Sequence, residues 1–328
     1  MDTPNTPITV LVLFGPTASG KTSILLELFK DSKEAEVISA DSMQVYRGMD
    51  IGTAKPSLEE RSLLPHHLID ILDPSRQFNA GDFVRLADAK CAQIVGRGKL
   101  PVVSGGTGFY LKNFIMGLSE APPSSEEVRA RLRNELKEKG AAALREELAA
   151  GDPVSAARIH VNDEYRLTRA LEVLRTCGKP LSAFKAREER ERYRFEIIGL
   201  SRPREELYSR INRRCDSMFL DGLESEVRSL YEAGYTPDDP GLRAIGYREF
   251  FTEDYDDTDG RKKWRLSRDI DGVKTLVSRN SRRYAKRQIT FFSCLPAVKW
   301  IESSPEEKET VKQIREILKN GTAVKPMA

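Results

Sequence analysis

Short apolar runs alternate with amphipathic stretches over the first third of the chain. Residues 8–14 (ITVLVLF), 36–40 (EVISA) and 100–104 (LPVVS) are apolar and short, which predicts buried β-strands. Between them, residues 22–30 and 83–96 repeat apolar positions at helical spacing. This alternation of strands and helices is typical of a parallel sheet covered by helices. The sequence therefore predicts an α/β fold.

The pattern changes near the Ala121-Pro122-Pro123 segment. Beyond it the apolar positions follow only helical spacing for a long stretch, and no run predicts a strand. The clearest part is residues 164–177, where leucines recur on one helical face. We therefore expect an all-helical domain, residues 119–194, inserted into the α/β core.

The α/β pattern resumes after this insertion. Residues 195–200 (FEIIGL) predict another strand, and residues 297–301 predict a last one. Helices are expected at residues 204–220, 221–234, 265–290 and about 305–319. The core is therefore predicted to be divided in sequence, into residues 1–118 and residues 195–328.

Composition places the chain among ordinary globular proteins. Of its 328 residues, 31% are charged and 39% are hydrophobic. The longest apolar run, residues 8–14, is far shorter than the ~20 residues that span a bilayer, and it lacks the basic leader of a signal peptide. The four cysteines show no C-x-x-C spacing, and with three histidines they offer no zinc-ligand cluster. We expect a cytoplasmic protein with free thiols.

The net charge of +3 conceals two segments of opposite sign. Residues 253–259 (EDYDDTD) are acidic and predict a local surface loop, to which no role is assigned. Residues 261–287 hold eleven Lys or Arg residues against two Asp. Such a run is either a solvated helix face or a surface that follows the phosphates of a nucleic acid. Composition leaves both interpretations open.

A phosphate-binding loop follows the first predicted strand. Residues 15–22 (GPTASGKT) match G-x-x-x-x-G-K-[ST] and lie between a strand and a helix, as that motif requires. Backbone N–H groups of such a loop form an anion nest, and the helix adds the positive end of its dipole. The predicted diphosphate-binding residues are Gly15, Pro16, Thr17, Ala18, Ser19, Gly20, Lys21 and Thr22, with the Thr22 hydroxyl as a ligand of Mg²⁺. The fold is thus expected to be P-loop NTPase-like.

The acid of a Walker B strand is not evident. Residues 100–104 are followed by Gly105-Gly106-Thr107, where an NTPase or kinase would carry that acid. Asp70 and Asp73 are possible substitutes, but their run is short and poorly shaped for a buried strand. A kinase acting on a nucleotide or small molecule therefore stays as an alternative.

Five further segments carry a family resemblance. They are residues 41–56 (DSMQVYRGMDIGTAKP), 65–70 (PHHLID), 105–110 (GGTGFY), 243–248 (RAIGYR) and 286–290 (KRQIT). In this order and spacing the chain resembles the tRNA dimethylallyltransferase (isopentenyltransferase) family, of the bacterial type, over nearly its whole length. The resemblance implies transfer of a dimethylallyl group from dimethylallyl diphosphate to N6 of adenosine 37 in tRNAs that read codons beginning with U. The products are N6-(dimethylallyl)adenosine and diphosphate.

The resemblance implies four catalytic residues. Asp41 is the general base that accepts the proton of the poorly nucleophilic adenine amine, and Thr107 contacts the target base. Lys21 and Arg214 neutralise the diphosphate. Asp41 also follows the second predicted strand, at the carboxyl edge where α/β sheets bind ligands. Without the resemblance, a turn or helix N-cap role would be equally plausible.

The acceptor base must leave the anticodon stack to react. Gln44, beside Asp41, is expected to hydrogen-bond an adenine edge. The tRNA-binding residues that the resemblance implies are Asp41, Ser42, Met43, Gln44, Thr107, Arg129, Arg166, Arg169, Arg243, Arg248, Lys286, Arg287 and Gln288. For each arginine the alternative is an exposed helical residue paired with a glutamate. The aromatic residues Tyr46, Phe109 and Tyr110 either line an isoprenoid channel or pack against the sheet.

The remaining expectations concern histidines, assembly and rival functions. Adjacent side chains of an extended segment point in opposite directions, so at most one of His66 and His67 faces the site. His160 is expected to cap or pack a helix of the insertion. We expect a monomer. Besides a kinase, the open alternatives are a non-catalytic RNA-binding protein and a transferase that prenylates free AMP.

Overall fold

The computed structural model describes residues 7–122, 125–184, 190–255, 262–304 and 306–321. The chain forms two compact units, one made of Met1–Phe114 with Glu191–Ala328 and the other of Ile115–Arg190. The first unit is the α/β core and is therefore built from two separate segments. The second is the helical insertion, whose predicted borders at 119 and 194 lie slightly C-terminal of these.

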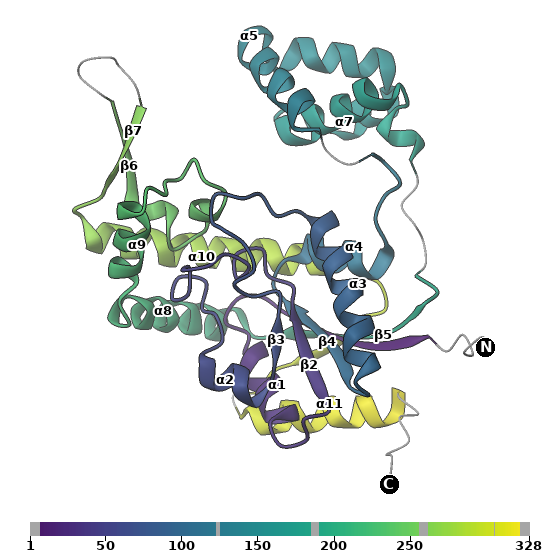
Figure 1. Cartoon of the computed structure of the whole chain (residues 1–328), viewed down its shortest axis with the longest axis vertical. Helices are drawn as coiled ribbons and strands as arrows, with labels where there is room; N and C mark the ends of the chain where they lie inside the picture. Colours follow the sequence, from purple (N-terminus) through teal and green to yellow (C-terminus); the bar gives the residue numbers. More distant parts are fainter. Residues whose placement is uncertain (1–6, 123–124, 185–189, 256–261, 305, 322–328) are drawn as a thin grey trace. The chain divides into compact units, whose positions relative to one another are not determined.

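The core contains one six-stranded sheet in which every pair of neighbours is parallel (Figure 1). Its order is β3-β2-β4-β1-β5-β8. The strands are β1 Ile8–Phe14, β2 Ala35–Ser39, β3 His66–His67, β4 Leu100–Gly105, β5 Tyr193–Ser201 and β8 Lys299–Glu302. Because all strands run the same way, the segments that follow β1, β2 and β4 meet at one edge. The predicted α/β fold with a parallel sheet is confirmed.

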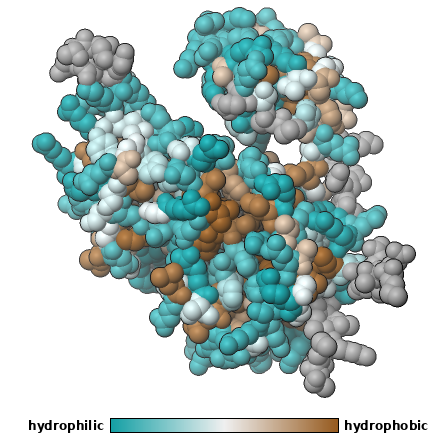
Figure 2. Space-filling model, in the orientation of Figure 1, coloured by the Kyte–Doolittle hydropathy of each residue, from teal (hydrophilic) through white to brown (hydrophobic). Residues whose placement is uncertain are grey.

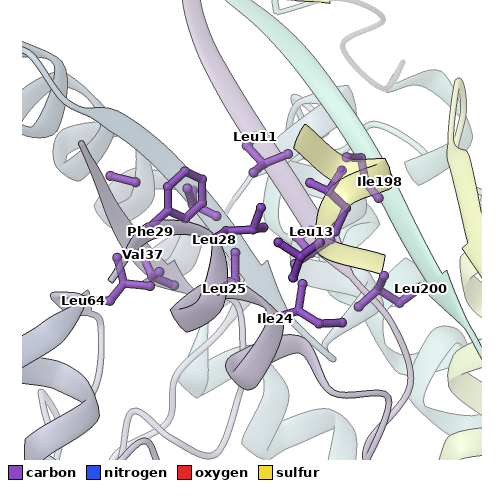
Figure 3. Close-up of a cluster of buried hydrophobic side chains, with 14 of the residues drawn as sticks. Leu11, Leu13, Ile24, Leu25, Leu28, Phe29, Val37, Leu64, Ile198 and Leu200 are labelled. Atoms are coloured by element: carbon purple, nitrogen blue, oxygen red, sulfur yellow. The ribbon is translucent and has the colours of Figure 1, made fainter. Parts of the chain in front are cut away.

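Helices cover both faces of this sheet. Their bounds are α1 Lys21–Phe29, α2 Leu58–Leu63, α3 Ala80–Gly96, α4 Gly108–Met116, α8 Arg204–Leu220, α9 Leu223–Glu232, α10 Ile270–Phe292 and α11 Glu307–Gly321, with short 3₁₀ turns at Gly241–Arg243 and Arg248–Phe250. On one face Leu11 and Leu13 of β1 pack with Ile24 and Leu25 of α1 (Figure 3), and Ile314 of α11 joins this cluster.

The opposite face of the sheet packs against aromatic residues. Side chains of a strand alternate between the two faces, and Phe14 contacts Phe292 of α10 with ring centroids 4.7 Å apart. Phe114 of α4 lies 5.6 Å from the ring of Phe195 in β5. This face therefore carries α4 and the end of α10, and α10 reaches the loops at the carboxyl edge.

The structure corrects the predicted helix over residues 265–290 and the predicted acidic loop. Strands β6 Phe251–Tyr255 and β7 Lys262–Leu266 form a separate antiparallel hairpin, and α10 begins only at Ile270. The side chains of Phe251 and Trp264 are buried on one side of the hairpin. The acidic strand faces the basic one, with Lys262 Nζ 3.1 Å from Glu253 Oε1. Residues 256–259 of the acidic stretch lie outside the described residues.

The helical unit has its own apolar core. Its helices are α5 Glu126–Gly151, α6 Pro153–Arg158 and α7 Glu164–Cys177, followed by a 3₁₀ turn at Leu181–Ala183. Helix α5 is kinked at Gly140, where φ is 77°. Leu167 and Leu171 of α7 are buried against Leu144 and Leu148 of α5, as the leucine pattern predicted. The described part of this unit contains helices and no strand, as expected.

The surface agrees with the composition. Hydrophilic residues cover most of the face shown in Figure 2, and hydrophobic residues form smaller patches. None of the helices in the described part of the chain is long and apolar enough to cross a membrane.

Candidate active site

The phosphate-binding loop joins β1 to α1, as its sequence predicted. Its backbone bends through two left-handed residues, Ala18 with φ 63° and Gly20 with φ 97°. Lys21 Nζ folds back over the loop and donates to the carbonyl oxygens of Gly15 at 2.9 Å and Pro16 at 3.0 Å. Alternation of left-handed and right-handed residues turns successive N–H groups toward one side, which is the geometry of an anion nest.

Two cavities adjoin beside this loop. The first, of about 920 Å³, is lined by the loop itself, by residues 50–58 and by arginines of α8. The second, of about 320 Å³, is lined mainly by residues 42–43, 244–245 and one face of α10. The residues that line both are Thr17, Asp41, Thr53, Arg214, Met218 and Tyr284. Asp41 and Arg214 therefore lie at the junction of the two cavities.

Two cations and one carboxylate share this junction. Burial and the charge of Arg214 together lower the pKa of Lys21 to about 8, whereas the charge of Asp41 acts in the opposite direction. Burial also lowers the pKa of Arg214, again opposed by Asp41. Among the described residues Arg214 has no hydrogen-bond or ion-pair partner, so its guanidinium is available to an anion.

Asp41 uses its two carboxylate oxygens differently. Its Oδ1 accepts the backbone N–H of Met43 at 2.8 Å and that of Gln44 at 3.4 Å. Its Oδ2 has no hydrogen bond to any residue in the described ranges. Asp41 therefore caps a turn, as one sequence interpretation held, and also presents a free oxygen at the junction, as the other requires.

Thr107 connects the end of β4 to the Asp41 turn. Its hydroxyl accepts the backbone N–H of Ser42 at 2.9 Å and lies 3.3 Å from the Ser42 hydroxyl. Tyr284 of α10, which the sequence analysis missed, lines both cavities next to these residues. Burial and the charge of Asp41 raise the pKa of Tyr284 to about 12, and hydrogen bonds with Thr107 and Gln288 oppose this shift. Tyr284 could have been identified from the sequence by its position one helical turn before Gln288.

Two glutamine side chains brace the site. Gln44 Oε1 accepts the hydroxyl of Ser39 at 2.9 Å, and its Nε2 donates to the carbonyl oxygen of Ala54 at 3.2 Å. Gln288 is buried, with Oε1 accepting the Thr17 N–H at 2.9 Å and Nε2 donating to the Gly106 carbonyl at 2.8 Å. Both amides are thus held by hydrogen bonds within the protein, and their contact with tRNA stays a prediction.

Glu226 of α9 anchors the loop that lines the first cavity, a role that the sequence analysis did not foresee. Its carboxylate accepts three consecutive N–H groups, from Asp50 at 2.9 Å, Ile51 at 2.8 Å and Gly52 at 3.2 Å. Tyr247 donates its hydroxyl to the same carboxylate at 2.6 Å. A Cβ atom at Gly52 would lie 2.4 Å from the Tyr247 ring, so only glycine fits there.

The predicted tRNA-binding cations of the core fall into two groups. Arg243 donates to the carbonyl of Asp238 at 2.6 Å, and Arg248 donates to that of Phe251 at 2.9 Å and lies over the Trp264 ring. Lys286 and Arg287 of α10 are exposed and have no ion-pair partner in the described part of the chain. The first group is held by contacts within the protein, whereas the second is not, and contact of any of the four with tRNA stays a prediction.

The insertion arginines are also divided. Arg169 Nη1 lies 2.8 Å and Arg129 Nε 3.6 Å from the same Glu172 carboxylate oxygen, and the Glu172 side chain is 1% exposed. Arg166, whose side chain is 72% exposed, pairs with Asp163. Two of the three thus stabilise the helical unit itself. Contact of any of them with tRNA stays a prediction.

The histidines and the substitute Walker B acids lie in other networks. His67 Nε2 is 2.7 Å from Glu36 Oε2 near the amino end of β2, away from Asp41. His66 Nδ1 is 2.7 Å from the carbonyl oxygen of Leu64. Asp70 pairs with Lys55 and with Arg61.

His160 and Asp73 each shape a local turn. Asp73 Oδ1 accepts the N–H of Ser75 at 2.9 Å, and exposed His160 Nδ1 accepts that of Asn162 at 3.2 Å. Neither residue lines a cavity at the junction.

Two of the three candidate channel aromatics are buried in the core, and the third is exposed. Tyr46 and Tyr110 are buried, and Tyr110 stacks on Phe83 with ring centroids 4.9 Å apart. Phe109 is 57% exposed. None of the three lines either cavity. The apolar contacts at the junction come from Met218 and Tyr284.

Comparison with known proteins is consistent with this geometry. Residues 44–294 match the family model described as IPP transferase, and residues 8–70 match that of isopentenyl transferase. The tRNA dimethylallyltransferase of Geobacter sulfurreducens is 45% identical over 89% of this chain and 91% of its own. That of Geobacillus thermodenitrificans is 45% identical over 92% of this chain and 93% of its own. The crystal structure of a tRNA isopentenylpyrophosphate transferase from Bacillus halodurans has a TM-score of 0.64 and 39% identity, and the match covers 95% of this chain and 97% of that one.

Proposed function

This chain belongs to the tRNA dimethylallyltransferase family and modifies tRNA by prenyl transfer, and from that premise we propose that its donor is dimethylallyl diphosphate and that its acceptor is N6 of adenosine 37. The tRNAs are those that read codons beginning with U, and the products are N6-(dimethylallyl)adenosine and diphosphate. The observation that carries the proposal is the place of Asp41, at the junction of a phosphate-binding cavity and a second cavity.

The donor occupies the first cavity with its diphosphate in the nest of residues 15–22. Lys21 and Arg214 face the diphosphate and offset the negative charge that grows on it as the allylic C–O bond breaks. Thr22 lines the same cavity, and its hydroxyl forms no hydrogen bond within the described residues, which suits a Mg²⁺ site shared with diphosphate oxygens. Mg²⁺ bound there would add to the neutralisation of the leaving group.

The acceptor base enters the second cavity after leaving the anticodon stack. Ser42, Met43 and Ile245 line that cavity, and Arg287 lies at its α10 side. The N6 nitrogen forms a bond to C1 of the dimethylallyl group while the C1–O bond breaks, and the electron pair of that bond leaves with diphosphate. The proton of N6 passes to the free Oδ2 of Asp41. We further propose that the protein acts as a monomer in the cytoplasm.

The proposal is tested by incubating the protein with labelled dimethylallyl diphosphate, Mg²⁺ and unmodified tRNA. Nuclease digestion should release labelled N6-(dimethylallyl)adenosine from position 37. Label transferred to free AMP in preference to tRNA would contradict the assigned acceptor. Transfer of the γ-phosphoryl group of ATP to a small acceptor, with no labelled adenosine, would contradict the assigned donor and indicate a kinase.

Donor affinity is expected to fall above pH 8. Burial and Arg214 lower the pKa of Lys21 to about 8, so the free protein holds the ammonium charge below this pH and loses it above. A bound diphosphate favours the charged form, so binding at higher pH must take up a proton. The dissociation constant for dimethylallyl diphosphate should be nearly constant below pH 7, about double by pH 8 and rise about a further fivefold between pH 8 and pH 9.

Calorimetry in buffers of different ionisation enthalpy measures both the affinity and the proton uptake. The Lys21→Arg variant supplies the control, because a guanidinium stays charged over this range. Its donor affinity should be lower than that of the wild type but independent of pH. An equally steep pH dependence in both proteins would assign the titration to another group.

Loss of the free cations of α10 should weaken tRNA binding. Lys286→Ala with Arg287→Ala is expected to raise the dissociation constant for tRNA and to lower the slope of log affinity against log salt by about 1 per residue. Lys274→Ala is the matched control, since this lysine lies on the same helix and already pairs with Asp216 at 2.7 Å. Filter binding at several salt concentrations compares the two, and equal slopes would argue against a phosphate contact at Lys286 and Arg287.

A further inference from the structure

The carbonyl groups of the phosphate-binding loop are held from outside by two arginines. Arg210 Nε donates to the carbonyl oxygen of Ala18 at 2.9 Å, and Arg202 Nε donates to that of Ser19 at 3.0 Å. Both arginines come from the segment that follows β5, far from the loop in sequence. Because a trans peptide group is planar, holding the Ser19 carbonyl on the outer side turns the Gly20 N–H to the inner side. The N–H that follows the Ala18 carbonyl, that of Ser19, donates to the Pro16 carbonyl at 3.2 Å and closes the turn of the loop. The hydrogen bonds from the two arginines therefore favour the nest geometry of the loop.

Ala18 is the strained point of this loop. Its φ of 63° lies in the left-handed region, which a residue with a Cβ atom adopts only at a cost. Gly20, with φ 97°, adopts such a conformation freely. A non-glycine residue persists there only when its surroundings over-determine it. Two hydrogen bonds act on the peptide that follows Ala18: Arg210 donates to its carbonyl oxygen, and its own N–H donates to the Pro16 carbonyl at 3.2 Å. Of these, only the bond from Arg210 comes from a distant part of the chain.

Arg210 is itself oriented by the C-terminal helix. Its Nη2 lies 3.6 Å from Glu307 Oε1, at the start of α11. The same Glu307 oxygen accepts the hydroxyl of Ser23 in α1 at 2.9 Å. Glu307 thus ties the arginine to the helix that continues the loop, so the Arg210 side chain is anchored at both its Nε and its Nη2.

We propose that Arg210 is a positioning residue, which keeps Ala18 in its left-handed conformation and so keeps the anion nest formed before the diphosphate binds. This inference rests on the proposed donor site. Arg210 also lines the first cavity, so the rival role is direct contact with the diphosphate. The two roles differ in one respect. Only the positioning role predicts that the loss of diphosphate binding on replacing Arg210 depends on which residue occupies position 18.

The test is a double-mutant cycle read out by binding of inorganic diphosphate in the presence of Mg²⁺. Arg210→Met should weaken diphosphate binding about tenfold, because Ala18 then relaxes toward ordinary φ values. Ala18→Gly alone gives the reference affinity of the cycle, since glycine accepts positive φ without strain and needs no partner to hold it there. The double variant should recover to within about threefold of Ala18→Gly.

Arg214→Met, alone and with Ala18→Gly, is the matched control. Arg214 faces the cavity and has no hydrogen bond to the loop within the described residues, so glycine at position 18 should give no recovery. Thermal unfolding of each variant shows whether it is folded, and Arg210→Gln replaces Arg210→Met if the latter is not. Recovery in the Arg210 cycle alone supports the positioning role.

The outcomes separate the two proposals. Diphosphate binding by the wild type without recovery in the Arg210 cycle would overturn the positioning role and leave the donor site intact. Equal recovery in both cycles would also overturn it, because glycine at position 18 would then raise the affinity for diphosphate whichever arginine is missing. Failure of the wild type to bind diphosphate would overturn the donor site and the positioning role together.

Discussion

The Asp41→Asn variant is expected to lose tRNA prenylation by about 10²–10⁴-fold in kcat. In the proposed reaction N6 releases a proton as the new C–N bond forms, and an amide cannot accept it. Asparagine keeps an oxygen at the place of Oδ1, so it preserves the hydrogen bonds from the N–H groups of Met43 and Gln44. Alanine would remove that turn together with the base, and the asparagine variant is therefore the cleaner test. Its dissociation constant for tRNA should change little.

Asp73→Asn is the matched control for this experiment. Asp73 also caps a turn through Oδ1, which accepts the N–H of Ser75 at 2.9 Å, but it lines neither cavity. Its turnover should stay within about twofold of the wild type, as for most substitutions away from a site. Single-turnover prenylation of bound tRNA measures the chemical step in both variants. A rate for Asp41→Asn close to that of the wild type would show that Asp41 is not the base.

The Arg214→Met variant is expected to lose about 10²–10³-fold in kcat. Arg214 lies at the junction of the two cavities, and the described residues supply no partner for its guanidinium. In the proposed reaction the allylic C–O bond breaks there. The charge of Arg214 would therefore act mainly on the diphosphate as negative charge grows there. An interaction that strengthens in the transition state lowers kcat and kcat/KM together when it is removed.

Arg213→Met provides the comparison for Arg214. Arg213 is the neighbouring residue on α8, is exposed and donates to the Ser209 hydroxyl at 3.3 Å. It lines the first cavity but not the second. Its loss should raise KM for the donor less than about tenfold, the effect of a solvent-screened charge. Equal losses of kcat in the two variants would mean that long-range charge, and not the position of Arg214, determines the rate.

Local sequence was sufficient for the main elements of the core. The apolar runs at residues 8–14 and 100–104 form β1 and β4, because a strand buried on both faces has to be apolar throughout. It was insufficient for the hairpin of β6 and β7. The acidic residues of β6 suggest a solvated loop. Their pairing with Lys262 and Arg265 of β7 becomes visible only in the tertiary structure. Asp269 then caps α10 by accepting the N–H of Gly272, which sets the helix start later than predicted.

The candidate site was likewise predictable from the sequence only in part. The sequence by itself determined the phosphate-binding loop, since its geometry depends on glycines and on the helix that directly follows. The family resemblance pointed to Asp41 and Arg214, and the fold brings them to the same junction.

Only the tertiary structure decided what the polar side chains around them do. Gln288 reaches Thr17 across 271 positions of sequence, and Glu226 reaches the loop at Asp50 across 176. A glutamine or glutamate is equally suited to bind a substrate or a backbone, and its partner depends on which strands and helices meet. The sequence therefore predicts which groups react, whereas long-range packing determines which residues hold them in place.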